Sequence, residues 1–197
     1  MFPLGSTLVP GQVLPLRVFE PRYVALVQAC EAADHQFGVV LIERGSEVGG
    51  GDVRTGLGTL AVIEGLSPPV DGEFAFAAVG RSRLRVIEWL PDDPYPRAEV
   101  ELLEDRDSGV EGRARRTLVL GALRRVLDAA RRLGYAVPEL THLGDDPMVV
   151  SWNALIAAGL GSFDVQRILE TEDVIARLDA VIAVLGDTAE LLELRAQ

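Results

Sequence analysis

The chain has 197 residues, of which 30 are acidic and 19 basic, and its net charge is −11. Every basic residue is an arginine, so mechanisms that need a lysine amine (a Walker A phosphate loop, a Ser–Lys dyad or a Schiff base) are excluded. Cys30 is the single cysteine and cannot form an internal disulfide, and together with His35 and His142 it makes too small a set for a typical structural zinc site.

No part of the sequence indicates a membrane segment or an export signal. No run reaches the ~18 consecutive apolar residues of a membrane span. The first residues lack the basic and apolar regions of a signal peptide, and a single cysteine is typical of reducing compartments. These observations predict a cytoplasmic protein that contacts no membrane.

The first half of the chain predicts strands and one helix. Short apolar or alternating runs predict strands over 14–19, 37–42, 58–63, 73–79, 84–90 and 97–103. A turn is expected at Gly80, and the last run alternates so that Ala98, Val100 and Leu102 should be buried. Pro21 suits the first turn of a helix. One face of that helix is apolar: Tyr23, Leu26, Val27 and Cys30. Many short strands at regular spacing favour a sandwich or a barrel.

The second half predicts helices only. The polar stretch 104–112 is typical of a linker, and helices are expected over 113–133, 147–160, 164–170 and from Thr171 onward, the last kinked or ended at Gly186. We therefore predict an α+β protein with a β-rich domain over 1–107 and a helical subdomain over 112–197. The first of these domains holds 17 acidic and 9 basic side chains, a net charge of −8.

Two sets of arginines have alternative interpretations. Arg81, Arg83 and Arg85 fall on one face of a predicted strand, where such a stripe either binds phosphate or carboxylate groups or forms a solvated face paired with acidic neighbours. The arginine-rich face of the 113–133 helix has the same two interpretations. The acidic chain favours the second interpretation for both and disfavours a nucleic-acid partner.

No motif predicts catalysis. The glycines at 49–51 lack phosphate-loop spacing, and no serine stands in a G-x-S-x-G pattern. Cys30 lies on an apolar helix face, which is typical of a buried structural thiol. Asp145 and Asp146 could join Glu139 or Glu170 around a metal, but Asp146 before Pro147 is explained as a helix cap. We expect no catalytic residue, no metal and no cofactor.

Several sequence blocks, in order, resemble one family. They are F-P-L-G at 2–5, P-G at 10–11, L-P-L-R-V-F-E-P-R-Y at 14–23, F-G-V-V-L-I at 37–42, V-x-x-G-x-G-T-x-A at 53–61, G-x-x-R-L-R-V at 80–86, Y-P at 95–96, A-E-V at 98–100 and Q-R-I-L-E at 166–170. The chain resembles the N-terminal, substrate-binding domain of Lon proteases, and the F-E-P-R-Y block is the most specific part of the match.

The resemblance implies a fold and a role. The implied fold is a PUA-like β-barrel with one inserted helix, followed by a helical bundle. The implied role is a non-catalytic module that binds unfolded or degron-bearing polypeptides and serves as an adaptor to a protease or chaperone, because the length leaves no room for the ATPase and protease domains. Glu20, Arg22 and Arg83 are the motif residues expected to contact a ligand, although structural roles also explain them. A PUA-like RNA-binding module is the alternative, and an enzyme acting on a small molecule is the third hypothesis.

Overall fold

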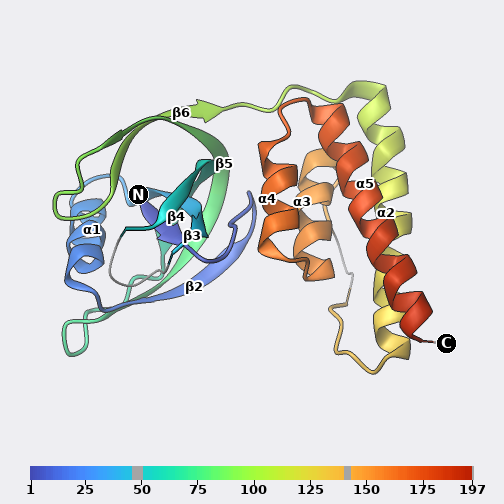
Figure 1. Cartoon of the computed structure of the whole chain (residues 1–197), viewed down its shortest axis with the longest axis horizontal. Helices are drawn as coiled ribbons and strands as arrows, with labels where there is room; N and C mark the ends of the chain where they lie inside the picture. The colour runs from blue at the N-terminus through green and yellow to red at the C-terminus, as the bar shows by residue number, and fades with distance from the viewer. Residues whose placement is uncertain (46–50, 140–142, 197) are drawn as a thin grey trace. The chain divides into compact units, whose positions relative to one another are not determined.

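The computed structural model of the chain describes residues 1–45, 51–139 and 143–196, which form six strands and five helices (Figure 1). The α+β class is confirmed. The chain divides into two compact units, Met1–Glu104 (the N-terminal unit) and Asp105–Gln197 (the helical unit). The predicted domains over 1–107 and 112–197 stay a prediction, because compactness alone does not show that either part folds by itself.

The N-terminal unit is one curved sheet with a helix beside it (Figure 1). Its strand order is β1-β3-β4-β5-β2, with β6 paired to β5. All neighbouring strands are antiparallel except β1 and β3, which are parallel. The elements are β1 (Phe2–Leu4), β2 (Val13–Val18), α1 (Pro21–Glu31), β3 (Gln36–Arg44), β4 (Val53–Glu64), β5 (Phe74–Leu90) and β6 (Arg97–Leu103).

The core of this unit lies between the concave side of the sheet and α1. The four α1 residues predicted to be apolar and inward are buried, which confirms that face. Phe2 of β1 stacks on Tyr23 of α1 with ring centroids 4.2 Å apart, and Phe37 meets Phe76 edge to face at 6.0 Å. The Cys30 thiol is buried and donates to the Gln36 carbonyl at 3.2 Å, and burial raises its pKa, so the structural interpretation of this cysteine is confirmed.

The prediction of a turn at Gly80 is wrong, because β5 continues through this residue. Gly80 is needed there for close approach: a Cβ at this position would lie 2.3 Å from the carbonyl oxygen of Val9. The chain before β2 crosses the strand at this point, with the Gly11 amide donating to the Gly80 carbonyl at 3.0 Å. The glycine at position 80 therefore reflects the close approach of another segment of the chain, and not a turn.

The predicted buried face of β6 is also wrong. Val100 is 39% exposed and Leu102 52% exposed. β6 pairs with β5 along one edge, and only Ala98 and Leu103 of this strand are partly buried. Alternation indicated a strand correctly, but it could not show whether another layer covers the apolar side.

The helical unit consists of α2 (Gly109–Arg132), α3 (Pro147–Ala158), α4 (Ser162–Glu170) and α5 (Val174–Arg195). The helix predicted from residue 113 begins four residues earlier, where the Asp107 carboxylate accepts from the Gly109 amide at 2.9 Å and Glu111 lies in the first turn. α5 runs through Gly186 without ending there, and Asp146 caps α3 as predicted. No helix in the described ranges combines the length and apolarity that crossing a membrane requires.

A buried arginine holds the start of this unit. Arg177 is 0% exposed; its guanidinium pairs with the Asp105 carboxylate, donates to the Thr171 carbonyl at 2.8 Å and lies 5.5 Å from the ring centroid of Trp152. Asp105 lies in the stretch predicted to be a linker. The boundary between the two units falls inside this stretch, between Glu104 and Asp105, and the ion pair with the buried Arg177 attaches Asp105 to α5. The linker prediction is wrong only from Gly109 onward, where α2 begins.

The Met1 amine is buried at the edge of the N-terminal unit and gives a pH-dependent stability. The amine donates to the Pro96 carbonyl at 2.7 Å, and burial lowers its pKa from 8.0 to about 6. The unfolded chain therefore binds more protons than the folded chain between these two pKa values, so stability rises with pH across this interval. We expect the free energy of unfolding to increase by about 2 kcal/mol from pH 6 to pH 8.

Urea unfolding at half-unit pH steps measures this slope. A His35→Gln/His142→Gln background removes both histidines of the sequence from the comparison. Because the sequence contains no lysine, an amine-reactive reagent modifies Met1 alone and reports the pKa of the amine directly. A flat stability profile in this background would contradict the prediction.

Candidate functional site

Two edge strands of the curved sheet, β1 and β2, border an open seam. They end the strand order, and no ladder between them is found among the described residues, so hydrogen bonds do not close the barrel. A hollow of about 110 Å³ lies at this seam, and we call it the seam pocket. Its lining residues are Phe2, Leu4, Leu16, Arg17, Val18, Phe19, Glu20 and Tyr23.

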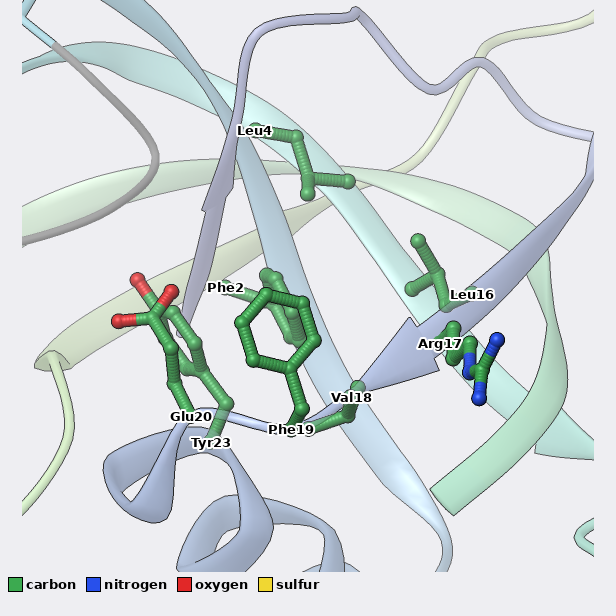
Figure 2. A pocket seen from close by; sticks show the side chains of 8 residues that line it. All are labelled: Phe2, Leu4, Leu16, Arg17, Val18, Phe19, Glu20 and Tyr23. Carbon is green, nitrogen blue, oxygen red and sulfur yellow. The ribbon is translucent and has the colours of Figure 1, made fainter. Parts of the chain in front are cut away.

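Each wall of the seam pocket is set by the strand behind it. Figure 2 shows Phe2 and Leu4 on β1 at one side and Leu16 and Val18 on β2 at the other. The parallel pairing with β3 positions the first pair of residues, and the antiparallel pairing with β5 positions the second pair. The walls are therefore apolar side chains from rigid strands, which keep the pocket preformed.

Phe19 is the exposed aromatic of the site. It follows the last residue of β2, and its side chain lines the pocket although the residue is 60% exposed. Pro21 begins α1 two residues later, so the chain turns sharply here. Phe19 therefore belongs to neither β2 nor α1. A large apolar ring held at the mouth of an apolar pocket is typical of a binding surface.

Both edges of the seam present a proline. The Gly80 amide donates to the Gln12 carbonyl at 2.9 Å, so the backbone groups of the even-numbered residues of β2 face β5 and the backbone of Pro15 faces outward. Pro3 lies in the middle of β1, in register with Val40 of β3, and has no N–H to donate. The missing donors explain why the sheet stops at these two edges.

The charged residues at the pocket neutralise one another. Arg22 donates to Glu20 at 3.1 Å and lies over the ring of Tyr23, 4.4 Å from its centroid. Arg17 pairs with Glu73 at 2.7 Å. The Tyr23 hydroxyl is not available as a base, because burial raises its pKa to about 12.

A second hollow of about 340 Å³ lies on the other side of Arg17. Its lining residues are Arg17, Ser67, Pro68, Val70, Glu73, Phe74 and Ala75. Val70 is strongly exposed there. The two hollows share Arg17, so a bound chain that left the seam pocket over this side chain would enter the second hollow.

The structure separates the three predicted ligand-contacting residues. Glu20 lines the seam pocket, and Arg22 is its ion-pair partner. Arg83 lies elsewhere, in β5, where it pairs in register with Thr59 and Leu103 and is only 4% exposed. That any of the three contacts a ligand stays a prediction.

Sequence reasoning missed Phe19 and Leu16 as site residues. A usable signal was present: in a strand whose Leu14, Leu16 and Val18 point inward, the residue at position 19 points outward. The exposure of Phe19, shortly before the proline that starts a helix, could therefore have been predicted from the sequence. The sequence could not predict that Phe2 and Leu4 face the same hollow, because their position depends on the pairing of β1 with β3.

The arginine stripe of β5 is not a free basic surface. Arg81 donates to Glu64 at 2.7 Å and Arg85 to Glu101 at 3.2 Å, as the solvated interpretation predicts. Arg83 is buried and so departs from that interpretation; a register shift beside Arg81 breaks the alternation of the strand. Nothing in this arrangement favours the RNA-binding alternative.

The candidate metal ligands do not gather. The Asp146 carboxylate accepts from the Met148 and Val149 amides at 2.8 and 3.1 Å, and Asp145 lies 3.5 Å from Arg116. In the part of the chain that the structure describes, no three His, Cys, Asp or Glu side chains are placed to hold a metal ion. His142 and the glycines at 49 and 50 lie outside the described residues.

Sequence comparison identifies relatives over nearly the whole chain. Residues 1–187 match the family described as the ATP-dependent protease La (LON) substrate-binding domain. Lon protease 2 of Myxococcus xanthus is 31% identical over 198 residues, which is 96% of this chain and 23% of the relative. Lon protease of Anaeromyxobacter dehalogenans is 29% identical over the same shares. The chain thus spans about a quarter of the length of these curated relatives.

Solved structures share the fold. The Lon N-terminal domain protein from Xanthomonas campestris matches with a TM-score of 0.70 and 31% identity, covering 92% of this chain and 95% of that one. The N-terminal domain of the Mycobacterium avium complex Lon protease matches with a TM-score of 0.66 and 21% identity, covering 94% and 96%. The second comparison supports the fold alone.

Proposed function

Because this chain belongs to the LON substrate-binding domain family, we propose that it binds segments of unfolded polypeptide in the seam pocket. The observation that supports this most is the apolar pocket at the open seam, with Phe19 60% exposed at its mouth. Unfolded chains differ from folded ones chiefly by their exposed apolar side chains. A preformed apolar hollow on a non-catalytic module suits such a ligand.

The wider role that we propose is that of an adaptor. The chain would present bound segments to a protease or a chaperone in the cytoplasm and would not itself be a catalyst. Two observations support this role. The match to the Lon relatives covers their substrate-binding part, and the groups around the seam pocket are paired ions and apolar rings without a nucleophile and base in contact.

Replacing Phe19 by aspartate is expected to weaken peptide binding by about 10- to 100-fold, because the variant loses the apolar contact and puts a charge at the mouth. The binding is measured by fluorescence anisotropy with 12-residue peptides chosen from an array of denatured-protein sequences. Binding by neither the natural chain nor any variant at high micromolar concentration would overturn the proposed function.

The matched control is Ile87→Asp. Ile87 is 61% exposed on β5 of the same unit and does not line the pocket, so it tests the effect of adding a charge at an exposed apolar position. We expect binding by this variant to change less than about twofold. Equal losses in the two variants would place the binding surface elsewhere.

A further inference from the structure

We infer that the seam pocket recognises an extended, net basic segment by inserting one of its aliphatic side chains, and that the segment does not join the sheet as an added strand. This inference rests on the proposed function and specifies which features of a polypeptide the same site recognises. Three features of the N-terminal unit carry it: the prolines at the two edges, the size of the pocket and the charge of the unit.

The edge prolines argue against strand addition. A peptide that extends a sheet exchanges N–H and C=O bonds with every second residue of the edge strand. On β2 these residues are Val13, Pro15 and Arg17, and the middle one has no donor. β1 has only three residues, all of them buried, and the middle one, Pro3, has no donor, so β1 offers no exposed run of donors. Neither edge offers two successive donors, so backbone pairing is weak at the place where the pocket lies.

The size of the pocket argues for one aliphatic side chain. Its volume is about 110 Å³. An apolar cavity of ~150 Å³ accepts a benzene ring, so a hollow somewhat smaller suits a leucine, isoleucine or methionine better than an aromatic ring. The Leu4, Leu16 and Val18 side chains that line it offer only apolar contacts to such a guest.

The net charge of the N-terminal unit favours particular ligand residues on either side of the inserted side chain. Met1–Glu104 contain 15 acidic and 8 basic side chains, a net charge of −7. The arginines nearest the pocket, Arg17 and Arg22, are each in an ion pair with a glutamate. The long-range potential is therefore negative around a locally neutral pocket, which favours a segment with lysine or arginine beside its aliphatic residue.

The experiment compares four forms of one unstructured nine-residue peptide with the full chain by anisotropy. The parent carries a central leucine flanked by two lysines among glycines and serines. The others replace the leucine by alanine, methylate the backbone nitrogens on both sides of the leucine, or replace the lysines by glutamates. We expect the alanine form to bind at least tenfold more weakly, the methylated form within about threefold of the parent, and the glutamate form more weakly, with a difference that shrinks in 0.5 M salt.

The outcomes separate the inference from the proposed function. A methylated form that loses binding while the alanine form retains it would show strand addition and overturn the inference alone. Tighter binding of the glutamate form would overturn its charge component. If no form binds but denatured-protein peptides do, a single side chain is not sufficient for recognition and the inference is wrong. If nothing binds, the proposed function fails with it.

A widened pocket tests the location of the inserted side chain. Leu16→Ala removes half-buried atoms from one wall, and a central phenylalanine should then gain affinity relative to leucine by about fivefold or more. Ile87→Ala is the matched control and should leave this ratio unchanged. Circular dichroism is used to check that both variants are folded. An unchanged ratio in Leu16→Ala would overturn the assignment of this pocket as the side-chain site.

Discussion

Replacing Asp105 by alanine is expected to lower the free energy of unfolding of the helical unit by about 3 kcal/mol. The change removes the carboxylate that pairs with Arg177, whose side chain is fully buried, and burying a charge without its counter-ion costs several kcal/mol. Urea unfolding followed by circular dichroism at 222 nm measures the effect, because the helical unit contains four of the five helices described.

Two further variants make this result specific. Glu104→Ala alters the exposed acidic neighbour and should change stability by less than about 0.5 kcal/mol. The double variant Asp105→Leu/Arg177→Met replaces both charges by apolar groups and should recover part of the loss, because no buried charge then remains. A loss in Asp105→Ala no larger than that in Glu104→Ala would show that the ion pair does not anchor the start of the unit.

Local sequence pattern predicted most elements of this fold. The run 37–42 falls inside β3, residues 97–103 are the observed β6, and the apolar face of α1 is buried as expected. These elements follow from side-chain periodicity within one short segment. The errors arose where segments distant in the sequence determine the structure. The backbone at Val9 crosses Gly80, and no layer covers Val100 and Leu102.

The candidate site was less predictable for the same reason. Glu20 and Arg22 were chosen from a motif, and the structure shows that they pair with each other beside the pocket. The pocket itself exists because β1 joins β3 while β2 joins β5, which puts two segments close in sequence at opposite ends of the strand order. No periodicity within either segment contains that information. The prolines at the two edges were visible in the sequence, but the outward direction of the Pro15 backbone follows from the register of β2 with β5.

Replacing Gly58 by alanine is expected to lower the free energy of unfolding of the N-terminal unit by about 3 kcal/mol, at the upper end of the usual cost of overpacking. A Cβ at this position would lie 2.0 Å from the Val39 carbonyl oxygen and 2.8 Å from Cγ1 of Val40. The backbone of β3 cannot yield to it without breaking the pairing in the centre of the sheet, since Gly58 lies between Val40 and Leu84. Cys30 is the single cysteine and is buried, so thiol labelling across a urea series reports the opening of this unit.

Gly56→Ala is the control that separates this contact from a general effect of removing a strand glycine. Gly56 lies two residues away in β4, and a Cβ there would meet nothing within 4 Å. Both substitutions restrict the unfolded chain alike, so the difference between them measures the folded-state contact alone. We expect Gly56→Ala to change stability by less than about 0.5 kcal/mol. Similar losses in the two variants would mean that backbone conformation, and not the close approach of β3, explains why glycine occupies position 58.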